Sequence, residues 1–191
     1  MIIAFSGMHG TGKTTHIEKT EKFLRDKGYK TKVAHIINLS LINKIKKAEP
    51  EKNGLNKEFG KWYFTLPRIF IYVFDLIVFY FYSMPYWFGK KKVLLLDRYF
   101  YDRLANFNTN NFFIKLYIIT FRFLMIKPLT FFFNFGWEKA YERKPEYKEE
   151  FFAKLEKNYH FVMKGKNIIK LPDNDQQFIE GKISSFLRDS K

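Results

Sequence analysis

Short apolar runs alternate along the chain with longer stretches whose apolar residues recur at helical spacing. The short runs are almost continuously apolar, which is typical of parallel strands buried on both faces. We expect strands at residues 2–6, 31–37, 93–97, 130–135 and 167–171. We expect helices at about residues 13–27, 57–88, 101–125, 137–143, 148–164 and 175–188. This alternation predicts an α/β fold, a three-layer sandwich in which helices cover both faces of a five-stranded parallel sheet.

Length and composition predict a single domain over residues 1–191, because one sizeable core fits this length and no Gly-, Ser- or Pro-rich linker interrupts it. The absence of cysteine excludes disulfides and thiol chemistry. It agrees with a cytoplasmic protein, and we expect no signal peptide. His16, His35 and His160 lack the spacing of metal ligands, so we expect them to be surface or packing residues.

The formal net charge of +15 favours a polyanionic partner, such as a nucleic acid, an acidic membrane surface or a phosphorylated small molecule. The lysines are spread along the chain, and no nucleic-acid-binding module is recognisable in it. A nucleic acid is therefore not the expected partner, and a small phosphorylated molecule is favoured.

The strongest chemical signal is the loop Gly7-Met8-His9-Gly10-Thr11-Gly12-Lys13-Thr14, which fits the pattern G-x-x-x-x-G-K-[ST] between an expected strand and an expected helix. The glycines allow backbone N–H groups to surround a triphosphate at the positive end of the helix. Lys13 would reach the β- and γ-phosphates, and Thr14 would offer its hydroxyl to Mg²⁺. The loop predicts ATP and Mg²⁺ as cofactors, bound by the positions Gly7, His9, Gly10, Thr11, Gly12, Lys13, Thr14 and Thr15.

A second signal is the apolar run 93–96 that ends in Asp97, Arg98 and Tyr99. A carboxylate at the end of a parallel strand would lie beside Thr14 and help to hold the magnesium ion. Arg98 would then be placed to bind a second anion, and its planar guanidinium suits a phosphate.

On these residues the chain resembles the thymidylate kinases, within the nucleoside monophosphate kinases of the P-loop class. The resemblance continues through residues 127–133, as the fourth strand, and 137–143, as the start of a lid. It implies a P-loop NTPase fold with a short lid at about residues 143–150. It also implies transfer of the ATP γ-phosphoryl group to a nucleoside monophosphate, with dTMP as the leading acceptor.

The resemblance also implies roles for individual residues. Arg98, with Tyr99 beside it, would hold the acceptor phosphate, and Phe64 and Arg68 would contact the acceptor base. Lys13, Arg98 and Arg143 would stabilise the charge of the phosphoryl group in transfer.

The chain departs from the family pattern in four places. His9 stands where a carboxylate is usual, Asp102 stands where a serine is usual, residues 35–40 lack an Arg-Glu-Pro-Gly run, and the lid has no second arginine. No carboxylate follows the second strand closely enough to act as a base on a hydroxyl acceptor, which favours a phosphate acceptor. Two alternatives stay open: a kinase of another phosphorylated or lipid-linked acceptor at a membrane surface, and a nucleotide-binding switch without catalysis.

Residues 69–88 are almost wholly apolar and long enough to span a bilayer. Asp75 and Pro85 interrupt this stretch, and spanning would separate the glycine-rich loop from Asp97, so we expect no transmembrane helix. The resemblance favours a homodimer through this stretch and the aromatic run 112–125. A peripheral membrane contact assisted by the lysines at 90–92 is the alternative.

Overall fold

The computed structural model describes residues 1–8, 10–39, 62–134, 136–143, 149–171 and 175–189. Five strands form one sheet in the order β2-β3-β1-β4-β5, and every neighbouring pair is parallel. The strands are β1 (Ile2–Gly7), β2 (Lys30–His35), β3 (Lys92–Asp97), β4 (Leu129–Phe133) and β5 (Ile168–Leu171). The predicted five-stranded parallel sheet is confirmed.

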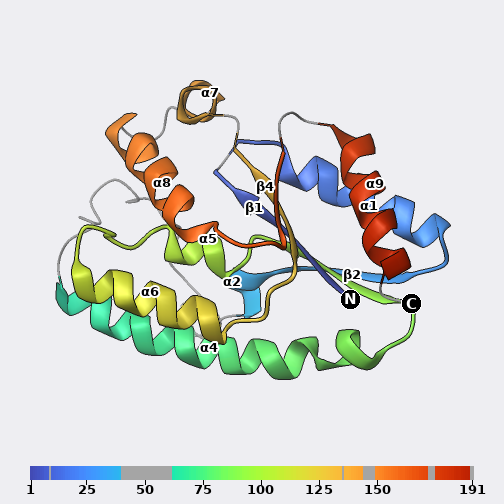
Figure 1. Ribbon diagram of the computed structural model, residues 1–191, viewed down its shortest axis with the longest axis horizontal. Coiled ribbons are helices and arrows are strands. Elements are labelled where there is room, and N and C mark those ends of the chain that lie inside the picture. Colours follow the sequence, from blue (N-terminus) through green and yellow to red (C-terminus); the bar gives the residue numbers. More distant parts are fainter. Residues whose placement is uncertain (9, 40–61, 135, 144–148, 172–174, 190–191) are drawn as a thin grey trace.

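Helices cover both faces of this sheet (Figure 1). One face carries α1 (Lys13–Asp26) and α9 (Gln176–Asp189), and the other carries α4 (Trp62–Phe88), α5 (Phe100–Leu104), α6 (Phe112–Leu124) and α8 (Glu149–Val162). Successive side chains of a strand point to opposite faces, so a central strand such as β1 serves both cores. Ile2 and Ala4 of β1 join the core with α4 and α5, whereas Ile3 and Phe5 join the core with α1 and α9.

The second strand is shorter than expected. It ends at His35, and Ile36–Leu39 form the short helix α2 instead of continuing the strand to residue 37. The Ile36 carbonyl accepts a hydrogen bond of 3.1 Å from Arg103, so the chain is held at the point where it leaves the sheet. The expected helix at 137–143 is present as α7 (Trp137–Arg143).

The single helix expected at residues 101–125 is two helices, α5 and α6. The segment between them is rich in asparagine, whose side chain competes with helical hydrogen bonding. The Asn111 side chain accepts hydrogen bonds from the N–H groups of Phe113 (2.9 Å) and Ile114 (3.3 Å). It therefore acts as the N-cap of α6 and gives that helix a separate start.

The 27-residue helix α4 continues through Pro67 and Pro85, and residues 57–61 of the expected helix lie outside the described residues. By length and composition alone the segment Pro67–Phe88 could cross a membrane, and 22% of it is buried. Its inner side packs on the sheet, where Leu76 is 5% exposed and Phe79 is fully buried. The inner side of α4 thus belongs to the core of the domain.

Because all five strands are parallel, their carboxyl ends meet at one edge of the sheet. β1 runs there into the glycine-rich loop, and Phe5 of β1 pairs in register with Asp97 at the end of β3. Asp97 also pairs with His35 at the end of β2. The residues of the candidate site gather at this edge.

Candidate active site

The loop after β1 follows a path that requires glycine. Gly7 has a φ of 143°, and a Cβ atom there would lie 2.5 Å from the carbonyl oxygen of Phe133 on β4. Gly10 and Gly12 have φ angles of 78° and 80°, in the left-handed region. The helix α1 begins directly after Gly12 and has no acidic residue in its first turn. The loop therefore ends at a helix N-terminus, where backbone N–H groups favour an anion.

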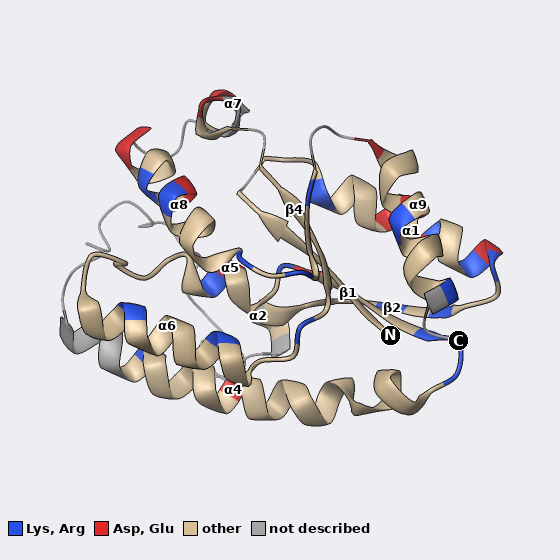
Figure 2. Cartoon of the chain, viewed as in Figure 1, with Lys and Arg blue, Asp and Glu red and all other residues tan. Residues whose placement is uncertain are grey.

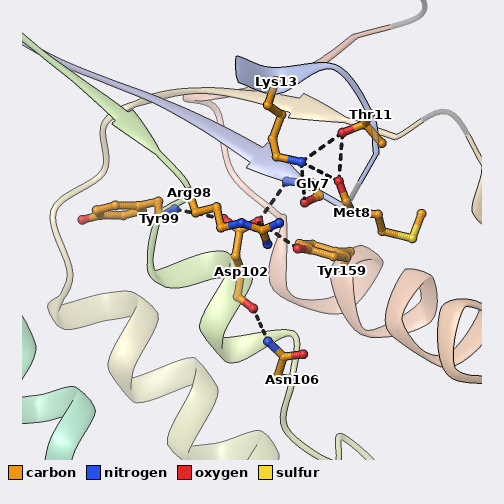
Figure 3. Close-up of polar contacts among 9 residues, drawn as sticks. All are labelled: Gly7, Met8, Thr11, Lys13, Arg98, Tyr99, Asp102, Asn106 and Tyr159. Carbon is orange, nitrogen blue, oxygen red and sulfur yellow. Dashed lines mark hydrogen bonds and ion pairs between the residues drawn. The ribbon is translucent and has the colours of Figure 1, made fainter. Parts of the chain in front are cut away.

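Lys13 folds back into this loop (Figure 3). It is 6% exposed, and its Nζ donates hydrogen bonds to the Gly7 carbonyl (3.0 Å), the Met8 carbonyl and Thr11 Oγ1 (3.0 Å). Burial, and then the Arg98 guanidinium, lower the pKa of Lys13 to about 8. The ammonium group is thus buried near a second cation, an arrangement that an anion would stabilise.

Asp102 connects this loop to three other parts of the fold (Figure 3). Its Oδ1 accepts hydrogen bonds from the Gly7 N–H (2.9 Å) and from the hydroxyl of Tyr159 on α8 (2.8 Å). Its Oδ2 accepts one from the Tyr99 N–H (2.9 Å), and Oδ1 lies 4.0 Å from a guanidinium nitrogen of Arg98. Sequence reasoning assigned Asp102 no role, and the only signal it carried was its departure from the family pattern.

Arg98 follows β3 directly and has a φ of 67°, an uncommon left-handed conformation for a residue with a side chain. Its N–H donates a hydrogen bond of 2.9 Å to the Phe5 carbonyl on β1, which holds the turn against the sheet. Its side chain is 15% exposed and ion-pairs with Asp102. The structure thus brings Arg98 and Lys13, far apart in sequence, to the same edge.

Asp97 and Thr14 offer hard oxygen donors at this edge. Asp97 ends β3 beside β1, and Thr14 and Thr15 are exposed in the first turn of α1. Mg²⁺ is commonly held by one or two protein oxygens, with phosphate oxygens and water completing its shell. Within the described ranges, no group of three or more His, Asp or Glu side chains could hold a metal ion. Asp97 and Thr14 are thus donors of the type that Mg²⁺ prefers.

The other residues expected to bind the acceptor lie on α4 (Phe64 and Arg68) or in the core (Tyr99). Arg68 is partly exposed on α4. Burial raises the pKa of Tyr72 one turn further on, and the charges of Arg103 and Arg68 oppose that rise. The backbone of Phe64 belongs to the first turn of α4, and its side chain lies outside the described part. Tyr99 is fully buried, and its hydroxyl donates to the Ile126 carbonyl at 2.8 Å. Its side chain packs in the core, which corrects the expectation that Tyr99 contacts the substrate.

Three predicted features cannot be placed in full. His9 of the loop and residues 144–148 of the lid lie outside the described residues. Arg143 ends α7, and its side chain also lies outside them. The expected roles of His9 and Arg143 stay predictions.

His35 lies at the site edge, where sequence reasoning expected only a surface or packing residue. It ends β2 opposite Asp97 and is partly buried. Burial lowers the pKa of His35, against the opposing influence of Asp97. The imidazole is therefore neutral at pH 7 and able to accept a proton at this edge.

A buried ion pair holds α5 against α4 behind the site. Arg103 donates hydrogen bonds to Asp75 and, at 3.1 Å, to the Ile36 carbonyl, and both charged side chains are less than 10% exposed. The Arg103 guanidinium also lies over the ring of Tyr72, 5.3 Å from its centroid. Asp75, which interrupts the apolar stretch in the sequence, thus faces a cation inside the fold.

Comparison with known proteins gives a match at the level of structure. No protein-family model matches this sequence, and no curated protein matches it. Among solved structures, the chain is similar to a thymidylate kinase from Ehrlichia chaffeensis, with a TM-score of 0.58 and 17% sequence identity. The match covers 98% of both chains, so it includes the sheet and both helical layers. This chain thus has the P-loop NTPase fold of that thymidylate kinase.

Proposed function

We propose that this protein transfers the γ-phosphoryl group of ATP to a nucleoside monophosphate, with dTMP as the leading acceptor. The observation that carries this proposal is that Lys13 and Arg98 meet around Gly7 and Asp102. The Lys13 Nζ donates a hydrogen bond to the Gly7 carbonyl at 3.0 Å, the Gly7 N–H donates one to Asp102 Oδ1, and that oxygen lies 4.0 Å from an Arg98 guanidinium nitrogen. Two cations held close together are suited to a multiply charged anion, such as a phosphoryl group in transfer. The fold likeness to a thymidylate kinase supports a nucleotide as the ligand.

The loop and the start of α1 would bind the phosphates of ATP. Backbone N–H groups of the loop after Gly7 and of the first turn of α1 would donate hydrogen bonds to the phosphate oxygens, and Lys13 would contact the β- and γ-phosphates. Thr14 and Asp97 would hold Mg²⁺. When bound, this ion would neutralise part of the negative charge of the phosphates. Gly7 and Asp102 would keep the loop in place, because the Gly7 N–H is already bonded to that carboxylate.

The acceptor would bind on the Arg98 side of the site. Arg98 would hold the acceptor phosphate, Arg68 and Phe64 would contact the base, and Arg143 from the lid would approach the transferring group. An ionised phosphate oxygen needs no general base, so positioning and charge stabilisation would supply most of the rate.

Coupled ADP release tests the proposal with ATP, Mg²⁺ and a panel of nucleoside monophosphates and nucleosides. We expect turnover with dTMP, and we expect Arg98→Ala to lower kcat/KM by about a hundredfold or more, because a charge at the transferring group is lost. Arg25→Ala is the matched control, since Arg25 is 62% exposed on α1 and pairs with Glu21 of the same helix. If the protein binds ATP but releases no ADP with any compound of the panel, a non-catalytic switch or an acceptor of another class would be favoured.

The position of His35 favours a second candidate, a kinase that phosphorylates a nucleoside hydroxyl. A hydroxyl acceptor requires a base, and a neutral imidazole at the end of β2 is able to serve. The variant His35→Asn separates the two candidates. Loss of activity by about a hundredfold on a nucleoside would favour the hydroxyl acceptor, whereas unchanged activity on dTMP would favour the monophosphate kinase.

A further inference from the structure

The described part of the chain exposes its large hydrophobic side chains almost entirely on two helices. Except for Val33, every large hydrophobic residue that is exposed there lies on α4 or α6. Six of them are phenylalanines with more than 70% of their surface exposed: Phe70, Phe81 and Phe88 on α4, and Phe112, Phe113 and Phe123 on α6. We call the outward surface that carries them the α4–α6 face.

The two helices form one continuous surface because they lie side by side and run in the same direction (Figure 1). The Tyr117 hydroxyl, midway along α6, donates to the Ile69 carbonyl in the first part of α4 (3.4 Å). The Tyr80 hydroxyl, further along α4, donates to the Leu124 carbonyl at the end of α6. On α4, exposed apolar residues recur every three or four positions from residue 70 to 88, which places them on one side of the helix.

This surface is larger than a soluble monomer ordinarily exposes. At about 150–250 Å² for each aromatic side chain, six phenylalanines exposed to this degree present on the order of 600 Å² or more. The largest apolar patch on a monomeric soluble protein is about 300–600 Å² and is often functional. The α4–α6 face therefore requires a partner.

Lysines lie on α6 and directly after the ends of α4 and α6. Lys90, Lys91 and Lys92 follow the end of α4, Lys127 follows the end of α6, and Lys115 lies on α6 itself. Lys127 lies 5.9 Å from the ring centroid of Phe123, so charge and apolar surface are adjacent. In the described part of α4 and α6 the single carboxylate is Asp75, which is buried against Arg103. In Figure 2 the acidic positions outside these two helices lie on α1, α7, α8 and α9 and at the edge of the sheet beside α5.

We propose that the α4–α6 face docks this protein onto an anionic lipid surface. An apolar centre rich in phenylalanine, with Trp87 and a border of lysines, is the composition of helices that lie in the membrane interface. The phenylalanines would enter the boundary between headgroups and acyl chains, and the lysines would contact lipid phosphates.

The helices lie on the membrane in this arrangement and do not span it. The inner side of α4 carries Phe79 and the Asp75–Arg103 pair, which are buried within the domain. A helix that spans would have to remove these groups from the core and place a charged pair among acyl chains. Only the outward half of α4 is available to lipid.

The charge of the border favours lipid over a second copy of the chain. Two copies that paired through this face would bring two borders of lysines together without an exposed carboxylate on either helix to face them. Like charges opposed in this way are unfavourable, whereas an anionic surface neutralises them.

Co-sedimentation tests the proposal with the full chain and two kinds of vesicle, one of phosphatidylglycerol and phosphatidylcholine in equal parts and one of phosphatidylcholine alone. We expect binding to the anionic vesicles that weakens as salt is added. Trp87 provides a second signal, because its fluorescence should shift to the blue on binding. The shift should be lost in Trp87→Phe while sedimentation persists.

Two pairs of variants separate the apolar and charged contributions. Phe81→Ser with Phe123→Ser should weaken binding by about tenfold for each residue, and their exposure leaves the fold intact. Lys90→Glu with Lys127→Glu should weaken it by at least about fivefold for each lysine. Lys19→Glu with Lys22→Glu is the matched control, because it makes the same change in net charge on exposed positions of α1.

Three outcomes would overturn the proposal. Wild-type protein that fails to bind anionic vesicles at low salt excludes a lipid partner. Equal loss of binding in the α1 control would show attraction by net charge without a docking face. A dimer in sedimentation velocity that Phe81→Ser with Phe123→Ser dissociates, together with no vesicle binding, would assign the face to a second copy.

Discussion

The charge of Lys13 depends on its burial and on the cation beside it. In the free protein its pKa is lowered to about 8 by burial and by Arg98. ATP phosphates favour the charged ammonium and raise that pKa, so binding above about pH 8 takes up a proton. We therefore expect ATP affinity to fall as pH rises above about 8, by up to about tenfold per pH unit.

Calorimetry in two buffers of different ionisation enthalpy measures this uptake directly. We expect nearly none at pH 7 and a clear fraction of a proton per ATP at pH 9. Lys13→Arg should abolish it, because a guanidinium does not titrate in this range. Uptake that persists in Lys13→Arg would show that another group titrates.

Asp102 stabilises the site through several hydrogen bonds at once. Asp102→Ala would leave the N–H groups of Gly7 and Tyr99 and the hydroxyl of Tyr159 without their acceptor. We expect the free energy of unfolding to fall by about 3–5 kcal/mol, measured by urea denaturation. Tyr159→Phe removes one of these bonds and should cost about 1.5–3 kcal/mol. Equal losses in the two variants would contradict a shared role for the carboxylate.

At the scale of elements, the contact between β1 and β4 depends on a glycine. Gly7→Ala would place a Cβ atom 2.5 Å from the Phe133 carbonyl oxygen at a φ of 143°. We expect it to reduce the free energy of unfolding by about 2–4 kcal/mol and to weaken ATP binding, because β4 or the loop must move. Thermal unfolding and ATP titration measure both effects.

Gly181→Ala is the matched control for that substitution. Gly181 lies inside α9, and a Cβ atom added there meets nothing within 4 Å. Alanine favours a helix over glycine, so this variant should gain about 0.5–1 kcal/mol. If both variants lose stability equally, the contact at Gly7 is not the cause.

At the scale of the whole molecule, the phosphate loop is joined to both helical layers, so a bound nucleotide should stabilise the entire domain. β1 contributes to both cores, and Asp102 connects the loop to α8. A nonhydrolysable ATP analogue at about a hundred times its Kd should add about 2.7 kcal/mol and raise Tm by about 5–10 °C. Differential scanning calorimetry measures this shift, and an undiminished shift in Lys13→Met would contradict binding at the loop.

Much of the fold and the centre of the site follow from local sequence. The strands β1, β3, β4 and β5 are largely apolar runs, and the loop from Gly7 to Thr14 carries its spacing within eight consecutive residues. Asp97 is identifiable because it ends such a run. These elements can be predicted from the sequence for two reasons. Parallel strands are buried on both faces, and a phosphate loop is built from neighbouring backbone groups.

Contacts between distant segments could not be read in this way. Asp102 and Gly7 are 95 positions apart, and no local pattern relates a helix carboxylate to a loop N–H. The break between α5 and α6 depends on Asn111 acting as a cap, and the burial of Tyr99 depends on helices packed over it. Asparagine also occurs in loops, and tyrosine also occurs on protein surfaces. The residue type alone therefore predicts neither the cap at Asn111 nor the burial of Tyr99.

By itself, therefore, the amino-acid order determined the class of fold and the phosphate-binding loop, because both arise from periodicity and from adjacent residues. Only the tertiary structure places Arg98 beside Lys13 and bonds Asp102 to the loop. It also decides which sides of α4 and α6 face outward. An apolar helix looks the same in sequence whether its outward half is covered or exposed. Its environment is set by the sheet and the helices that pack against its other half.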